Sequence, residues 1–417
     1  MKHHASRRRI ALAGFTLVEL MVALGLSMIL AIVLLKMQAA LGQQRMRTSD
    51  IAERDTELRA SMDLISQDIS STAYLFGNMT QPCDAIFSYN GTSGTGKYYT
   101  RHPVDAIAAS TSAAMNFASS LTLNYPTDSN ASDVLVLTSS NDARSFNDSV
   151  APQLTGDPTS TTSPLTSGLM KISVGSQTAP VVNHMALLET AIQNASGTTQ
   201  NACFRVPVTL YTSATSTVTS SGNYMPSTFY AGYQPSLTAA GFGALGNGQL
   251  LNNPKFVDIG DPAGATQQQT TTAYYIDGSG TFPVLMRSQW SVLNDAPIPG
   301  SSQQIAAGVV SLQARFNIGG GVYQTAATTT ANGQWSQVCS VRIALITRSI
   351  NDDPDPLYTW APTALTPGVL NTRTIVPGAP FSNYAISDTF KHRRFLLQTT
   401  ELAVRNSLLP KLGTLTC

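Results

Sequence analysis

Apolar residues form one long run near the start of the chain and a regular stripe after it. The run covers residues 15–35, about 21 positions that carry a single charge, Glu19. As a helix that rises 1.5 Å per residue, it would be roughly 31 Å long, which is enough to cross the hydrocarbon core of a bilayer. The pattern therefore predicts a transmembrane helix over residues 15–35.

The helical pattern continues beyond this run. From Leu58 onward, apolar residues recur at steps of three and four, which puts them on one side of a helix. No proline occurs before Pro82, and Gly77-Asn78 is a typical C-terminal stop signal. We therefore expect one helix of about 60 residues whose second half, residues 36–77, is amphipathic. The stripe consists of Leu58, Met62, Ile65, Ile69, Ala73 and Phe76.

After residue 78 the pattern becomes one of short strands separated by polar stretches rich in serine and threonine. Two of these stretches, residues 159–163 and 212–221, are interpreted as loops or insertions. The expected strands are residues 133–137, 204–210, 273–276, 283–286, 341–346 and 394–404, and residues 305–316 are a strand or a short helix that leads into one. The expected fold class is α+β: a long helix packed on a β-rich, mainly antiparallel head with loop insertions.

A basic leader precedes the apolar run. Residues 1–14 carry the four cations Lys2, Arg7, Arg8 and Arg9. The positive-inside rule places this leader in the cytoplasm and the remainder outside it. Removal of the leader would change the formal charge from +1 to −3, which leaves no basic field for nucleic acid. Residues 78–417 would then form the external head, with an inserted subdomain expected around residues 140–260.

Four cysteines, Cys83, Cys203, Cys339 and Cys417, all follow the expected membrane segment, in an oxidising compartment. None belongs to a C-x-x-C pair, which argues against metal binding and thioredoxin-like chemistry. Four cysteines allow three pairings. We favour Cys83–Cys203 and Cys339–Cys417, which would tie the end of the long helix to the first half of the head and fix the C-terminus.

Glu19 decides what kind of membrane segment this is, because a carboxylate inside a spanning helix is costly and therefore a functional candidate. A secretory signal has its small-residue cleavage site after the apolar core, whereas Gly14 precedes the core here. The order of basic leader, Gly14, Phe15-Thr-Leu-Val-Glu19 and apolar helix resembles the class III signal of type IV pilins and type II secretion pseudopilins. A plain anchor, with Glu19 at the level of the lipid headgroups, is the simpler alternative.

This resemblance implies a specific processing step. A prepilin peptidase would cut between Gly14 and Phe15 and methylate the new amine of Phe15. The resemblance also implies an assembly role for Glu19. In an apolar filament core, its carboxylate would neutralise the new cationic amine of a neighbouring subunit, so that neither charge is buried alone.

Later segments resemble the PilW family of minor pilins. They are residues 308–316, 341–348 and 393–406, together with residues 133–137 and 201–203. The resemblance implies a minor pilin that primes assembly of a type IV pilus and sits at or near its tip, with twitching motility and cell adhesion as the associated processes. The implied location is a single pass through the bacterial inner membrane with a periplasmic head, and afterwards the pilus fibre. The implied partners are prepilin peptidase, other minor pilins, the major pilin, the inner-membrane assembly platform and, as a further candidate, a large tip adhesin.

Three alternatives to this function remain open. A type II secretion minor pseudopilin of the GspJ kind would share the signal and the helix. A tip adhesin or DNA-uptake receptor would bind through the polar loops, with Tyr224, Phe229, Tyr230 and Tyr233 as exposed aromatics. A membrane-anchored enzyme comes last, because the sequence has no catalytic constellation.

Two motifs resemble ligand-binding sites but lack the flanking sequence that such sites require. Residues 241–246 fit G-x-G-x-x-G, but proline-containing segments flank them in place of a strand and a helix, so no dinucleotide cofactor is expected. Asp352, Asp353 and Asp355 form an acidic loop that is a weak candidate for calcium. Prolines separate these acids, and turns rich in Asp and Pro are common without metal. No metal or other cofactor is therefore expected.

Overall fold

The structure is a computed structural model. Several sequence predictions lie outside the residues that it describes: the Gly14–Phe15 cleavage site, the loops at 159–163 and 224–233, the motif at 241–246, Asp355 and Cys417. The described residues are 16–72, 77–78, 81–90, 97–107, 132–140, 144–145, 153–154, 169–171, 181–193, 199–213, 217–219, 251–260, 269–280, 282–291, 296–298, 300–353, 374–375, 379–386, 388–390 and 392–404.

A single long helix, α1 (Leu17–Ser71), opens the described chain. It ends at Ser71 and not at the expected stop, Gly77, which instead begins a short strand. Three hydroxyls at this end bond back to helix carbonyls: Ser70 to Gln67, Ser71 to Asp68 and Thr72 to Asp68, at 2.7–2.8 Å. The chain divides into two compact units, the first ending at Arg54 and the second beginning at Asp55.

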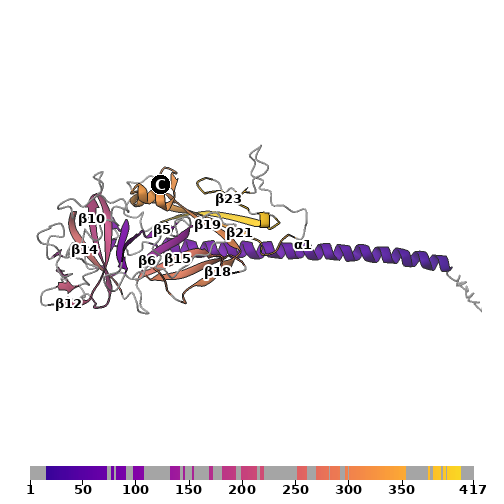
Figure 1. The fold of residues 1–417 in the computed structure, drawn as a ribbon, viewed down its shortest axis with the longest axis horizontal. Helices are drawn as coiled ribbons and strands as arrows, with labels where there is room; N and C mark the ends of the chain where they lie inside the picture. Colours follow the sequence, from indigo (N-terminus) through magenta and orange to yellow (C-terminus); the bar gives the residue numbers. More distant parts are fainter. Residues whose placement is uncertain are drawn as a thin grey trace, which may run out of the picture. The chain divides into compact units, whose positions relative to one another are not determined.

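The sheet that packs on α1 in the second unit is antiparallel, in the order β20-β19-β21-β24. Leu58, Met62, Ile65 and Ile69 of α1 are at most 3 % exposed and share one core with this sheet. The predicted helical stripe is thus confirmed over these four residues. In Figure 1, β18, β19 and β21 lie along this part of α1. The strands of the sheet are β19 (Val309–Asn317), β20 (Tyr323–Gln324), β21 (Ser340–Arg348) and β24 (Phe395–Ala403).

A second sheet, in the order β17-β16-β15-β6-β5 with β18 beside β16, contributes to the same core. Its other face carries a separate apolar cluster that includes Val136, Tyr275 and Trp290. Burial on both faces explains why residues 134–137 are continuously apolar and do not alternate. The strands are β5 (Val104–Ile107), β6 (Val134–Ser140), β15 (Gln269–Asp277), β16 (Val284–Ser291), β17 (Ala296–Pro297) and β18 (Gln303–Ala307).

Gly308 separates these two sheets along the chain. Its φ of 73° is in the left-handed region, which glycine adopts without a steric penalty. The chain turns there from β18, in the second sheet, into β19, in the first. Residues 305–316, expected as a strand or a short helix with a strand, are therefore two strands.

Two further sheets complete the β-rich part, and their strand pairs are antiparallel except for β3 with β11. The stretch 212–221, interpreted as a loop, is in part a hairpin in which Tyr211 pairs with Val218. This correction has a physical reason, since threonine and valine are β-branched and favour strands even in low-complexity sequence. The first sheet contains β3 (Ala85–Asn90), β4 (Lys97–Arg101), β7 (Arg144–Ser145), β10 (Met185–Gln193), β11 (Thr199–Pro207) and β14 (Leu251–Gly260), and the second contains β8 (Gln153–Leu154), β9 (Leu169–Lys171), β12 (Leu210–Thr212) and β13 (Thr217–Thr219).

Short elements lie at the margins of these sheets. Thr325 caps the helix α3, since its hydroxyl accepts a hydrogen bond from the backbone N–H of Thr328. A second apolar cluster, which includes Val310, Ile346, Tyr384 and Phe395, covers the face of β19 and β21 opposite α1. The remaining elements are β1 (Gly77–Asn78), β2 (Gln81–Pro82), α3 (Ala326–Ala331), η3 (Trp335–Gln337), β22 (Thr374–Ile375), β23 (Tyr384–Ala385) and η4 (Asp388–Phe390).

The disulfide Cys83–Cys203 joins the segment that follows α1 to strand β11, as favoured from the sequence. Both sulfurs are buried, since Cys83 is 3 % and Cys203 0 % exposed. Cys339 is not a free thiol. Its expected partner, Cys417, lies outside the described residues, so the pairing Cys339–Cys417 stays a prediction.

Removal of this disulfide is expected to destabilise the protein substantially. The bond closes a loop with a sequence separation of 120 residues, and the Cys83→Ala/Cys203→Ala variant should lose about 2–5 kcal/mol of unfolding free energy. Thermal unfolding of the full chain in detergent measures the effect. The variant Asp63→Asn, at an exposed position of α1, is the control, and a melting temperature of the cysteine variant equal to that of the parent would contradict the expectation.

Candidate assembly site

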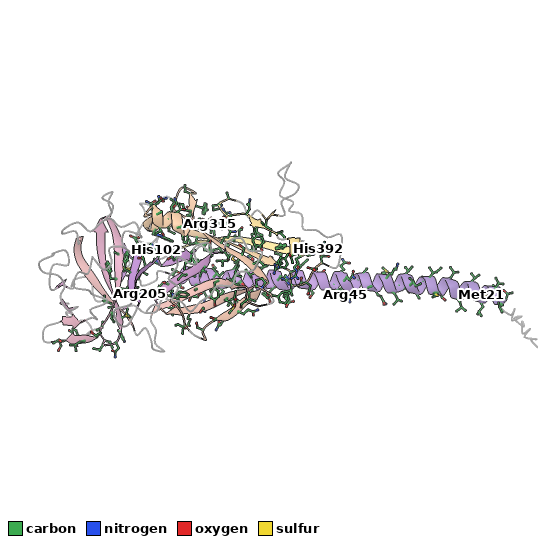
Figure 2. The ribbon with its side chains drawn as sticks, in the orientation of Figure 1. Met21, Arg45, His102, Arg205, Arg315 and His392 are labelled. Atoms are coloured by element: carbon green, nitrogen blue, oxygen red, sulfur yellow. A yellow bond between two sulfur atoms is a disulfide. The ribbon has the colours of Figure 1, made fainter. Side chains whose placement is uncertain are left out.

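The N-terminal part of α1 presents apolar side chains in every direction. The large apolar residues from Leu17 to Leu35 are 47–75 % exposed, and Met21, at 65 %, is among the side chains that project from the helix in Figure 2. Among the described residues, α1 is the helix that is long and apolar enough to span a membrane. An apolar surface of this size is stable in water only when lipid or other protein covers it. The exposed residues are Leu17, Val18, Leu20, Met21, Val22, Leu24, Leu26, Met28, Ile29, Leu30, Ile32, Val33, Leu34 and Leu35.

Glu19 lies at the very start of this helix, where it forms a reciprocal cap with Thr16. One oxygen of its carboxylate accepts hydrogen bonds from the backbone N–H and the hydroxyl of Thr16, both at 3.0 Å. The hydroxyl of Thr16 in turn accepts from the backbone N–H of Glu19 at 3.3 Å. This is the capping-box arrangement, and it satisfies two helix N–H groups that would otherwise lack partners.

The sequence analysis did not predict this cap, although its signal is present. Thr16-Leu-Val-Glu19 fits the T-x-x-E pattern that marks a helix start. Glu19 was singled out for its charge alone. The structure adds that the same carboxylate orders the first turn, because it is hydrogen-bonded to the backbone N–H of Thr16. Gly14 and Phe15 themselves lie outside the described residues.

The acidic loop has a different environment from the one that calcium requires. Asp352 accepts a hydrogen bond from Arg393 at 2.9 Å, and Asp353 pairs with Arg394. Each described carboxylate thus already has a guanidinium beside it, which opposes the approach of a further cation. No group of three metal-ligating side chains occurs among the described residues. Asp355, the third acid of the loop, lies outside the described residues.

Two polar clusters connect elements of the head. Asp68 of α1 accepts from the hydroxyl of Tyr274 at 2.6 Å and from Arg287 at 3.0 Å, which ties the helix to β15 and β16. Burial and the charge of Asp68 raise the pKa of Tyr274. A polar pocket of about 250 Å³ adjoins this cluster. The pocket residues are Asp68, Ser71, Leu137, Ser139, Thr270, Thr272, Arg287 and Gln289.

The second cluster surrounds Glu401 on β24. Its carboxylate accepts from Ser340 at 2.6 Å, from Tyr323 at 2.7 Å and from Asn317 at 3.3 Å. Desolvation alone would raise the pKa of Glu401, but these hydrogen bonds and the charge of Arg342 lower it overall. Both clusters bridge neighbouring strands with every partner accounted for, which is typical of polar groups that fix the packing of a sheet.

Comparisons with known proteins agree with the sequence-based resemblance. Residues 273–406 match the family described as PilW, type IV pilus-assembly protein W. A search of curated proteins finds no match. A solved type IV-like pilin from Thermus thermophilus is similar at 14 % identity; the match covers 34 % of this chain and 72 % of that pilin, with a TM-score of 0.19. Residues 273–406, which include the strands of the sheet β20-β19-β21-β24, are thus similar to the PilW family of type IV pilus-assembly proteins.

Proposed function

We propose that this protein is a minor pilin that primes assembly of a type IV pilus and resides at or near its tip. The observation that carries the proposal is the combination of two parts in one chain. The first is an exposed apolar helical segment with one acid at its start, and the second is a head in which residues 273–406 match the PilW family. The function is assembly and not catalysis.

The exposed apolar helix gives the protein two successive environments. Before assembly, residues 15–35 span the inner membrane once, with the leader in the cytoplasm and the head in the periplasm. The buried disulfide Cys83–Cys203 is compatible with that oxidising compartment. During assembly, the helices of neighbouring pilins replace lipid as the cover of the apolar surface. The partners are therefore other minor pilins, the major pilin and the inner-membrane assembly platform.

The size of the head supports a position at the tip. The described part of residues 85–403 forms four sheets with three or more strands each, far more structure than is needed to cover one helix. A head of this bulk would obstruct close packing of subunits in the middle of a thin fibre, but it meets no such obstacle at the end. The same position would place the head where it can carry a large tip adhesin.

Mass spectrometry of the mature N-terminus tests the proposal directly. We expect a chain that begins at Phe15 with one N-methyl group, because the peptidase implied by the class III signal cuts after Gly14. The Gly14→Val variant should retain the leader and stay in the membrane fraction, while Gly25→Val, a matched change within α1 with open space around it, should be processed normally. A mature chain that begins at Met1 would overturn the proposal.

Deletion of the gene separates a pilus role from a secretion role. We expect loss of surface pili and of twitching motility, with secretion of enzymes unaffected. Normal piliation combined with a secretion defect would identify a type II pseudopilin instead. The PilW match over residues 273–406 favours the pilus.

A further inference from the structure

Strand β24 forms one edge of the sheet that packs on α1. It pairs with β21 over all nine residues, from Phe395 opposite Arg348 to Ala403 opposite Ser340. Among the described residues, the sheet ends at β24, the yellow arrow in Figure 1. The outward backbone N–H and C=O groups of residues 396–403 pair with no described strand, so they could pair with another strand.

β24 lacks the features by which edge strands usually prevent such pairing. It contains no proline, lysine or arginine, and its register with β21 has no bulge. Proteins usually avoid long edge strands without such protection, because these strands associate with other chains. The other edges of the described sheets differ: β7, β8, β17 and β20 have two residues each, β12 has three and β5 has four. The pairing of β18 with β16 is irregular, and β4 has a cation at each end, Lys97 and Arg101.

The one charge on β24 does not guard the edge. Glu401 is held by Ser340 and Asn317, which lie on β21 and β19, and by Tyr323 on β20. All three donors belong to the same sheet, on the side away from the free edge. A strand that approaches the edge thus meets a carboxylate whose hydrogen bonds are already made.

We propose that β24 is a docking strand, and that an extended segment of a different pilus subunit adds to its free edge as a further strand of the sheet. The inference rests on the proposed function. An extended backbone is the partner whose alternating N–H and C=O groups match those of a strand edge.

The two faces of β24 specify the partner further. Leu396 and Leu402 are half-buried against the core that contains α1, so the partner residues on that face should be apolar. On the other face, Leu397, Thr399 and Ala403 are exposed, which suits small aliphatic or hydroxyl side chains. The partner segment should therefore alternate apolar residues with small aliphatic or hydroxyl residues and carry no net charge.

Proline substitution at two neighbouring positions tests the proposal. In an antiparallel edge strand, successive N–H groups point alternately to the neighbouring strand and outward. Proline has no backbone N–H, so one of the two variants Thr399→Pro and Thr400→Pro loses a backbone hydrogen bond to β21 and should melt at a lower temperature than the parent. The other variant loses only an outward N–H and should melt like the parent, but the amount of it recovered in sheared pili should fall at least about tenfold. Normal incorporation of the stable variant would overturn the proposal.

Photocrosslinking in piliated cells identifies the occupant. A photoreactive residue at Leu397, which is 38 % exposed on β24, should crosslink to a second pilus subunit. The matched position is Val322, 50 % exposed beside β20 at the opposite end of the sheet, where no such product is expected. Equal products from both positions, or crosslinks to a second copy of this chain alone, would contradict the proposal. If the chain is processed at Phe15 and enters pili while β24 yields no crosslink, the docking strand is wrong and the pilin function stands.

Discussion

Replacement of Glu19 by glutamine is expected to reduce incorporation of this protein into pili at least about tenfold while leaving it in the membrane. Glutamine can still accept the hydrogen bonds that Thr16 donates at 3.0 Å, so the cap at the helix start is retained. What the variant loses is the negative charge that would meet the cationic amine of a neighbouring subunit. The amount of protein in sheared pili, relative to the membrane fraction, measures the effect.

Two further variants separate the charge of Glu19 from its capping role. Thr16→Val removes the hydroxyl partner but keeps the carboxylate, and it should enter pili nearly as well as the parent protein. Glu53→Gln removes an exposed charge from the same helix beyond the apolar run, and it should have no effect. If Glu19→Gln is incorporated normally while Thr16→Val is not, Glu19 acts as a helix cap and the assembly role is wrong.

The elements that could be predicted from the sequence are those in which a local pattern coincides with burial. The stripe from Leu58 to Ile69 has helical spacing because one side of α1 meets a sheet. Residues 341–346 are continuously apolar because β21 is central and covered on both faces, by α1 on one side and the cluster around Tyr384 on the other. In both cases, the buried residues follow one another in a single segment, so their pattern can be recognised in the sequence.

The features that the sequence analysis missed depend on partners far away in the chain or on single hydroxyls. The early end of α1 at Ser71 coincides with hydroxyls that bond back to helix carbonyls. The pairing of β3 with β11 brings residues 85–87 beside 202–204, and no local periodicity encodes such a parallel contact. The edge position of β24 is likewise a property of the strand order, since its sequence resembles that of any half-buried strand.

A buried ion pair joins the two sheets that share the core with α1. One carboxylate oxygen of Asp133, beside β6, accepts hydrogen bonds from Arg315 at 3.0 Å and from the backbone N–H of Ala314 at 2.8 Å, both on β19. Arg315, labelled in Figure 2, also donates to the hydroxyl of Ser382 at 3.2 Å. Burial raises the pKa of Asp133, and the charge of Arg315 opposes that rise, so ionisation of the acid depends on this arginine.

Asp133→Ala should therefore be among the most destabilising single substitutions in the head. It leaves a guanidinium that is 7 % exposed without its counter-charge, and loss of one partner from a buried pair costs about 3–5 kcal/mol. For a unit of this size, the expected fall in melting temperature is about 4–7 °C. Thermal unfolding of the full chain in detergent, followed by circular dichroism, measures it.

The double variant Asp133→Ala/Arg315→Met decides whether the orphaned charge is the cause. Because methionine replaces the arginine with an uncharged chain, the double variant should recover part of the stability that the single variant loses. Asp352→Ala breaks the exposed pair with Arg393, in which the acid is 62 % exposed, and should cost less than about 1 kcal/mol. A double variant that melts well below Asp133→Ala would show that packing of the arginine, and not its charge, holds the two sheets together.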